Sequence, residues 1–256
     1  MSSVISTLEE LSSNSRRAVD RCWRVVEPQH RISTAKLTDT TAEQAVLEEA
    51  IEKTKPTIPP ECQHLHFLLK TPFRYGAPYP DGSRFRRAGH TPAVFYASEN
   101  PDTAIAETCF RRLLFFFHDS PDTKRPANAS EHTAFAVEYA TARSVDLTRS
   151  PFDNRTAAWM HLTRYDECQE LADLARGADI ELIKYASTRD PKNRTNIALL
   201  TCRAFANPNP VAFQSWRILL GNNGARAFCE MPEQTLDFGR KAFASDPRIA
   251  AIRWER

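Results

Sequence analysis

Apolar residues recur at helical spacing in three segments of the chain. The first, residues 42–53, follows the capping-box sequence Thr40-Thr41-Ala42-Glu43 and must end before Pro56. The second begins at Asn100-Pro101-Asp102, which supplies an N-cap, a proline at the first helical position and an acid in the first turn. Its apolar residues repeat every fourth position: Ile105, Cys109, Leu113 and Phe117. The third, residues 165–176, precedes Gly177. The spacing predicts three helices, each with one face in a core.

Short apolar runs elsewhere in the chain predict strands. They are too short for buried helices, and polar residues, proline or glycine bound them. The runs are residues 64–69, 93–97, 135–139, 144–147, 180–185, 197–200, 212–213 and 249–254. Residues 118–131 between them have the composition of a loop. Many short strands and few helices predict a mixed α+β fold.

The first 60 residues differ from the rest of the chain. Residues 1–19 are polar and rich in serine, which predicts a frayed helix or a flexible start, and TKPTIPPE at 54–61 predicts a stiff linker. We therefore expect a helical N-terminal extension at residues 1–60 without catalytic residues, followed by one domain at residues 61–256.

Composition narrows the class of protein. The chain has 7 glycines, and it contains neither G-x-G-x-x-G nor G-x-x-x-x-G-K-[ST], so a glycine-loop nucleotide site is not expected. Its six cysteines are scattered without a C-x-x-C pair, which favours reduced thiols and a cytoplasmic protein. Cys62, His64 and His66 alternate, but no second cluster completes a zinc site, so no metal is expected. The longest apolar run, residues 113–117, is too short to span a membrane.

A local concentration of basic residues marks the segment from Lys70 to His90. It holds Arg74, Arg84, Arg86 and Arg87 against the single acid Asp81, although the formal net charge of the whole chain is only +2. Guanidinium groups bind phosphate oxygens bidentately, so the segment suits a pyrophosphate. A solvated basic loop, or a weak nucleic-acid patch, explains the same composition.

Tyr96 and Glu107 are the next candidates for chemistry. A strand that ends near Tyr96 presents an aromatic face on which a nicotinamide ring can stack. A carboxylate at Glu107 can hydrogen-bond a ribose hydroxyl and stabilise the positive charge that develops when a bond at an anomeric carbon breaks. The alternative is that Glu107 forms a surface i, i+4 ion pair with Arg111, which stabilises an exposed helix by only a few tenths of a kcal/mol.

Four short segments in this order resemble the RES domain: residues 73–75, 82–89, 94–98 and 103–107. The resemblance covers roughly residues 64–205. Members of this family are toxins of Xre–RES toxin–antitoxin pairs, and their fold is similar to that of ADP-ribosyltransferases. The resemblance therefore implies an ADP-ribosyltransferase-like α+β fold and an enzyme that consumes NAD as its substrate.

The family's functional residues can be carried over to particular positions. Arg74, followed by Tyr75, matches the arginine that contacts NAD, and Arg84 matches the arginine of the glycine–arginine loop. Tyr96 matches the strand tyrosine and Glu107 the helix glutamate. The family's serine corresponds to Ser187, where it would hydrogen-bond the ribose or orient Glu107; Ser98 and Ser144 are the alternatives, and Ser98 is also a candidate for NAD binding.

The whole chain, with the segment before His64, resembles a longer subgroup of RES toxins that transfer ADP-ribose to proteins. The expected partners are then NAD, a target protein and a cognate helix-turn-helix antitoxin of the Xre type, with nucleic acid contacted only through the antitoxin and with no membrane. NAD hydrolysis or phosphorolysis would use the same site residues. A nucleic-acid-binding module that uses the basic segment at residues 70–90 is the alternative of another class, and it predicts binding that weakens steeply with salt.

Overall fold

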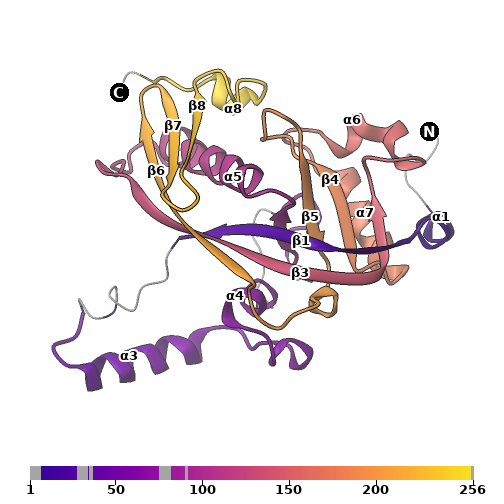
Figure 1. The fold of residues 1–256 in the computed structure, drawn as a ribbon, viewed down its shortest axis with the longest axis horizontal. Helices are drawn as coiled ribbons and strands as arrows, with labels where there is room; N and C mark the ends of the chain where they lie inside the picture. The colour runs from indigo at the N-terminus through magenta and orange to yellow at the C-terminus, as the bar shows by residue number, and fades with distance from the viewer. Residues whose placement is uncertain (1–6, 28–33, 35–36, 75–81, 90–91, 255–256) are drawn as a thin grey trace.

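Eight strands form the frame of the molecule (Figure 1). The structure is a computed structural model, which describes residues 7–27, 34, 37–74, 82–89 and 92–254. The strands are β1 (Arg16–Val26), β2 (Phe95–Ser98), β3 (Ser130–Asp146), β4 (Leu182–Ala186), β5 (Thr195–Leu199), β6 (Ala212–Gly221), β7 (Gly224–Cys229) and β8 (Gln234–Gly239). They follow one another across the sheet in the order β1-β2-β5-β4-β3-β6-β7-β8.

The sheet closes on itself at one end. Because β1 pairs with both β2 and β3, the strands β1-β2-β5-β4-β3 form a barrel-like ring, and β6, β7 and β8 continue from β3 as an antiparallel extension. The pairing of β3 with β4 is parallel, and the other pairings between the described strands are antiparallel. The prediction of a mixed α+β fold is thus confirmed, because the structure combines a barrel-like sheet with several helices.

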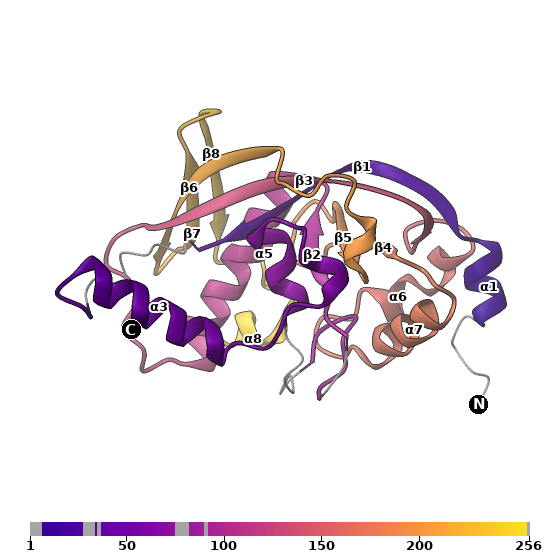
Figure 2. The ribbon, with the colours of Figure 1, turned by 90° about the horizontal axis from the view of Figure 1, so that it is seen from below.

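The helices lie mainly to one side of the two long strands, β1 and β3, which arch over them in Figure 2. The α-helices are α1 (Leu8–Ser13), α3 (Thr41–Thr54), α4 (Phe67–Lys70), α5 (Pro101–Leu114), α6 (Thr156–Trp159), α7 (Asp166–Gly177) and α8 (Pro247–Ala250). Short 3-10 helices are η1 (Pro60–Cys62), η2 (Thr71–Phe73), η4 (Phe152–Arg155) and η5 (Cys202–Ala204), and the π-helix η3 (Phe115–Asp119) continues α5. The predicted helices at 42–53, at 100 onward and at 165–176 are confirmed as α3, α5 and α7.

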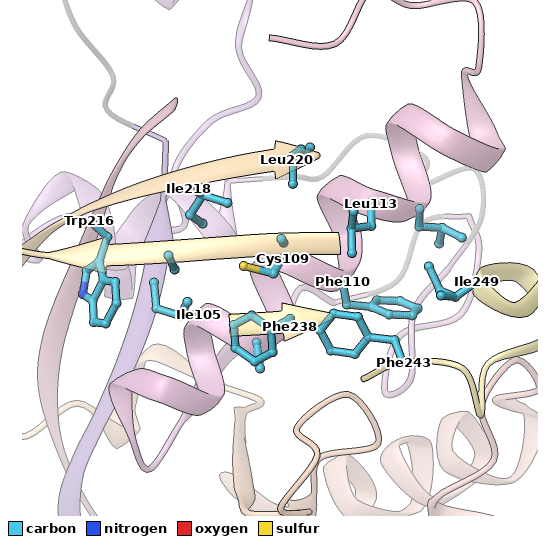
Figure 3. Close-up of a cluster of buried hydrophobic side chains, with 14 of the residues drawn as sticks. Ile105, Cys109, Phe110, Leu113, Trp216, Ile218, Leu220, Phe238, Phe243 and Ile249 are labelled. Atoms are coloured by element: carbon cyan, nitrogen blue, oxygen red, sulfur yellow. The ribbon is translucent and has the colours of Figure 1, made fainter. Parts of the chain in front are cut away.

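Helix α5 is fixed by the core between it and the β6–β8 extension. Its Ile105, Cys109, Phe110 and Leu113 form one core with residues of the extension such as Trp216, Ile218 and Leu220, and the Phe110 ring meets that of Phe243 edge to face (Figure 3). Burying such side chains stabilises the fold by roughly 1.5–3 kcal/mol each. One face of α5 is therefore committed to the core, and the residues on its other face, Glu107 among them, are held in a fixed orientation.

The prediction of a helical extension at residues 1–60 is wrong for residues 16–26, which form β1. This strand pairs with β3 from Arg16 to Val26 and with β2 at Trp23, so it belongs to the barrel-like ring. The partners that stabilise it lie more than 70 residues away in the sequence, and no local pattern announces them. Helix α3 stands apart from the sheet in Figure 1, and the structure confirms its capping box at Thr40 and Glu43.

Two other local predictions, both of strands, are wrong. Residues 64–69, expected as a strand, contain the start of α4, and residues 249–254 contain the end of α8 rather than a strand. In both segments a short apolar run is equally compatible with a buried helical turn. The strands expected at residues 135–139 and 144–147 are confirmed except at Leu147, and both belong to the single strand β3, which begins at Ser130 within the expected loop.

The expectation of reduced thiols throughout is also wrong, because Cys62 and Cys202 form a disulfide that joins η1 to η5. The other four cysteines are free and buried. Burial raises the pKa of the Cys109 thiol to about 12, which keeps it protonated and unreactive. In the described part of the chain, no helix has both the length and the apolar character that crossing a membrane requires.

Candidate active site

A pocket lies where α5 meets the barrel-like ring. Its walls come from β1, β2, α5, β4 and β5, so segments distant in the sequence build it together. The lining residues are Trp23, Arg24, Val25, Tyr96, Ala97, Ser98, Ala104, Glu107, Thr108, Arg111, Tyr185 and Asn196. Three predicted residues, Tyr96, Ser98 and Glu107, line this pocket together with cationic and amide side chains that the sequence did not single out.

The Glu107 carboxylate is anchored through one of its two oxygens. Ser187 Oγ and Asn196 Nδ2 both donate to Oε1, each at 2.7 Å, and Ser98 Oγ donates to Asn196 Oδ1 at 2.6 Å. All three donors are at most 3% exposed. Among the residues that the structure describes, none donates a hydrogen bond to Oε2. The carboxylate is therefore fixed in direction, with one oxygen available to a ligand in the pocket.

This arrangement changes the interpretation of three sequence predictions. Ser187 contacts Glu107, as the orienting role requires, whereas Ser144 bonds the backbone carbonyl of Arg16 and is not in the pocket. Ser98 pairs with Asn196 across β2 and β5, and its hydroxyl is used to orient that amide. Within the described residues Glu107 forms no ion pair with Arg111, so the surface ion-pair interpretation of Glu107 is wrong.

The turn that carries Ser187 is clamped onto the first turn of α5. Asp190 accepts a hydrogen bond from Thr103 Oγ1 at 2.7 Å, and Arg194 bonds both Asp190 and Asp102. The backbone amide of Asp190 donates in turn to Ser187 Oγ at 2.9 Å. Since α5 also carries Glu107, this clamp fixes Ser187 relative to the carboxylate that it contacts.

The clamp predicts a contribution to stability that depends on pH. Burial alone would raise the pKa of Asp190, but hydrogen bonds from Arg194, the Lys192 amide and Thr103 outweigh it and lower the pKa below 3.8. Because the native pKa is depressed, this stability is present above pH 3.8 and is lost as the pH falls through the native pKa. Acid unfolding of Asp190→Asn should therefore show a shallower loss of stability below about pH 4. If the free energy of unfolding of Asp190→Asn falls with decreasing pH as steeply as that of the wild type, the clamp is contradicted.

Tyr96 lines the pocket with its ring, while its hydroxyl is engaged behind it. The hydroxyl lies 2.8 Å from Ser83 Oγ and accepts a hydrogen bond from the Phe85 amide at 2.9 Å. Burial raises the pKa of Tyr96, and burial followed by the charge of Glu107 raises that of Tyr185 well above its usual value. Both phenols are therefore neutral near pH 7. Tyr96 also holds the segment at 83–86 against the pocket wall.

Arg24, which the sequence analysis passed over, brings a guanidinium to this pocket. It projects from β1, its Nη1 donates to the Tyr96 carbonyl at 2.8 Å, and its Cζ lies 5.0 Å from the centre of the Phe95 ring. The available signal was a charged residue within the apolar run Cys22-Trp23-Arg24-Val25-Val26. Arg111 and Asn196 were likewise missed as lining residues.

The arginines that the sequence nominated lie elsewhere. Arg74 follows η2 and pairs with Glu52 of α3 at 2.5 Å, and it does not line the pocket. Residues 71–73 form the 3-10 helix η2, and Arg74 is its C-cap, so Arg74 does not lie on a strand. Tyr75 lies outside the described residues.

Arg84 is 8% exposed, and its guanidinium is directed into the protein. It donates to the Trp159 and His161 carbonyls, at 2.5 and 3.1 Å, and to Thr188 Oγ1 at 3.2 Å, while its Cζ lies 4.8 Å from the centre of the Tyr165 ring. These acceptors use the terminal nitrogens that a pyrophosphate would need. The geometry gives Arg84 a structural role.

Arg84→Leu is therefore expected to lower the free energy of unfolding by about 3 kcal/mol, because buried carbonyls at Trp159 and His161 lose their donor. Urea unfolding followed by circular dichroism measures the change. Arg87→Ala serves as the control, since the ion pair of Arg87 with Asp173 is exposed and contributes less than about 1 kcal/mol. Wild-type stability in Arg84→Leu would contradict the structural role.

The nucleic-acid alternative loses its main support in the described part of the basic segment. Arg84 and Arg86 are 8% and 6% exposed, and Arg87 pairs with Asp173 at 2.6 Å. Phosphate contacts require guanidinium groups at the surface. Buried arginines do not form the accessible cationic patch that the alternative requires.

The fold and the pocket define a mixed α/β protein with an oriented carboxylate suited to chemistry at a sugar carbon. The family model of the RES domain matches residues 58–220, which is more than half of the chain. The chain therefore belongs to the RES-domain family, which is linked to NAD-using enzymes and to toxin–antitoxin systems. No curated protein matches the sequence. The matched range contains Glu107, Ser187 and Asn196, whereas Arg24 on β1 precedes it.

Proposed function

We propose that this chain is a cytoplasmic toxin that cleaves the nicotinamide–ribose bond of NAD and transfers ADP-ribose to a cellular protein. The observation that carries the proposal is the Glu107 carboxylate, whose Oε1 is fixed by Ser187 and Asn196 and whose Oε2 is available in the pocket. A carboxylate held in this way stabilises positive charge on a ribose without reorganising during the reaction. Membership of the RES-domain family supports NAD as the substrate.

In the proposed reaction the bond between the ribose anomeric carbon and the nicotinamide nitrogen breaks. The electron pair leaves with nicotinamide and neutralises its ring charge, and the ribose passes through an oxocarbenium-like state that Glu107 stabilises. A nucleophile then attacks the anomeric carbon and releases its proton. Glu107 Oε2 would accept a hydrogen bond from a ribose hydroxyl, while Ser187 and Asn196 hold Oε1.

Tyr96 and Arg24 would position the substrate in this pocket. The Tyr96 ring would stack on nicotinamide, because Tyr96 lines the pocket and its hydroxyl is already engaged by Ser83 and Phe85. Arg24 would contact the phosphate beside the nicotinamide ribose, in place of Arg74 and Arg84, which the structure puts elsewhere. NAD enters as the substrate, and the proposed chemistry needs no metal.

We prefer transfer to a protein over hydrolysis or phosphorolysis because the whole chain, with the segment before His64, resembles the longer, ADP-ribosyltransferase-like subgroup of RES toxins. The same resemblance supports an ADP-ribosyltransferase-like fold and a helix-turn-helix antitoxin of the Xre type. That antitoxin would block the pocket, so that nucleic acid is contacted only through it. On this account antitoxin and NAD compete for the enzyme.

Labelled NAD separates the possible acceptors. The purified chain is incubated with NAD that carries the label on its adenylate half, with buffer alone, with phosphate or with cell extract. Transfer predicts label on an extract protein together with released nicotinamide. Free ADP-ribose as the only labelled product would establish hydrolysis instead, and ADP-ribose 1-phosphate would establish phosphorolysis. The absence of nicotinamide release from folded, antitoxin-free protein in every mixture would contradict the proposal.

A further inference from the structure

A second pocket adjoins the Glu107 pocket along α5. Its lining consists of Glu27, Arg111, Arg112, Phe115, Phe116, Ser130 and Glu131, and Arg111 lines both pockets. The two pockets therefore share the Arg111 side chain as part of their walls. In contrast to the first pocket, the second is bordered by two phenylalanine rings.

One face of a single helix contributes side chains to both pockets. Glu107, Arg111 and Phe115 are spaced four residues apart on α5 and on the first residue of η3, so they follow one another along the same side. At 1.5 Å per residue, the step from Glu107 to Phe115 is roughly 12 Å. The opposite face, with Ile105, Cys109 and Leu113, packs against the β6–β8 extension in Figure 3.

The aromatic end of this face is held open to solvent. Phe115 is 44% exposed, although leaving a large apolar side chain in water is less favourable than burying it. Its ring meets Phe116 edge to face, with centroids 4.9 Å apart, and Arg112 lies over Phe116 at 5.5 Å while pairing with Glu27. The π-helix η3, a geometry found frequently at functional sites, carries both rings.

We propose that the second pocket binds the adenine ring of NAD, with Arg111 placed between the pockets to contact the diphosphate. The inference rests on the proposed function, because it extends the same substrate along α5. An aromatic platform stacks on the π-face of a base, and a carboxylate such as Glu27 accepts from the exocyclic amino group of adenine. The order carboxylate, guanidinium, aromatic ring then matches the order ribose, diphosphate, adenine in NAD.

The test compares NAD with nicotinamide mononucleotide, which has the same scissile bond but lacks the adenylate half. The expected result is that Phe115→Ala lowers the kcat/KM ratio of NAD to nicotinamide mononucleotide by about 10-fold, because one stacking contact is lost. Phe115→Trp should keep the ratio near that of the wild type. Phe67→Ala is the matched control, since Phe67 on α4 is 47% exposed and lines neither pocket.

A binding measurement separates failure of this inference from failure of the proposed function. AMP carries the adenine end alone, and calorimetry with AMP needs no cleavage. Binding to the wild type that weakens about 10-fold in Phe115→Ala supports the adenine pocket even if no nicotinamide is released. An unchanged substrate ratio together with unchanged AMP binding would overturn it. A loss confined to protein labelling, with NAD cleavage intact, would also overturn it and would assign the pocket to the acceptor protein.

Discussion

Glu107→Gln is expected to slow nicotinamide release from NAD by about 10²–10³-fold, the range found when one preorganised electrostatic group is removed from an active site. The glutamine carbonyl can still accept the hydrogen bonds that Ser187 and Asn196 donate to Oε1. The substitution therefore removes the negative charge and retains the anchoring contacts. Because the charge matters when the ribose becomes cationic, the effect should fall on kcat more than on KM.

The comparison uses steady-state nicotinamide release by the wild type and the variant, with unfolding by urea as the check on folding. Glu170→Gln is the matched control, since this exposed carboxylate lies on α7 and lines neither the Glu107 pocket nor the second pocket. Equal kcat values for the wild type and Glu107→Gln would remove Glu107 from the reaction. A loss of stability in Glu107→Gln that accounts for the lost activity would point to a structural role.

Arg24→Ala is expected to lower kcat/KM for NAD by about 10²-fold, because a charge-assisted contact to phosphate contributes about 1.5–3 kcal/mol. Arg24→Lys should recover part of the loss and not all of it. An ammonium keeps the charge, but it cannot donate to the Tyr96 carbonyl and to a phosphate in the same fork geometry.

A neighbouring arginine supplies the control for this prediction. Arg21 lies on the same strand, but its partner is Glu138 in an exposed pair at 3.5 Å. Arg21→Ala should retain the activity of the wild type. If Arg24→Ala also retains it, the guanidinium is not a substrate contact, and the pyrophosphate role would have to be reassigned within the pocket.

The carboxylate side of the candidate site follows from local sequence, whereas the cationic side does not. Helix α5 and its core face were predictable from Asn100-Pro101-Asp102 and the apolar spacing, so the side of the helix that carries Glu107 was predictable as well. The contact between Ser187 and Glu107 joins residues 80 positions apart. Only the family resemblance indicated it, since no helical or strand period connects the two positions.

Arg24 shows why the cationic side of the candidate site could not be predicted from the sequence. Its role depends on β1 joining β2 and β3 across long sequence separations, and short apolar segments give no information about such partners. Arg74 and Arg84 were nominated from the local charge and from the family resemblance, and neither shows which way a guanidinium points. Arg84 turned out to be enclosed by backbone carbonyls, and Arg74 to be paired with Glu52 of α3.

The most direct test of the account is the release of nicotinamide from NAD by the purified, antitoxin-free chain, followed by proton NMR as the nicotinamide resonances shift on cleavage. With cell extract added as the source of an acceptor, we expect one nicotinamide to be formed for each NAD consumed, at a rate that depends on enzyme concentration. NAD that remains intact in the presence of folded protein, with cell extract added to supply an acceptor, would contradict the assignment of the Glu107 pocket to this reaction.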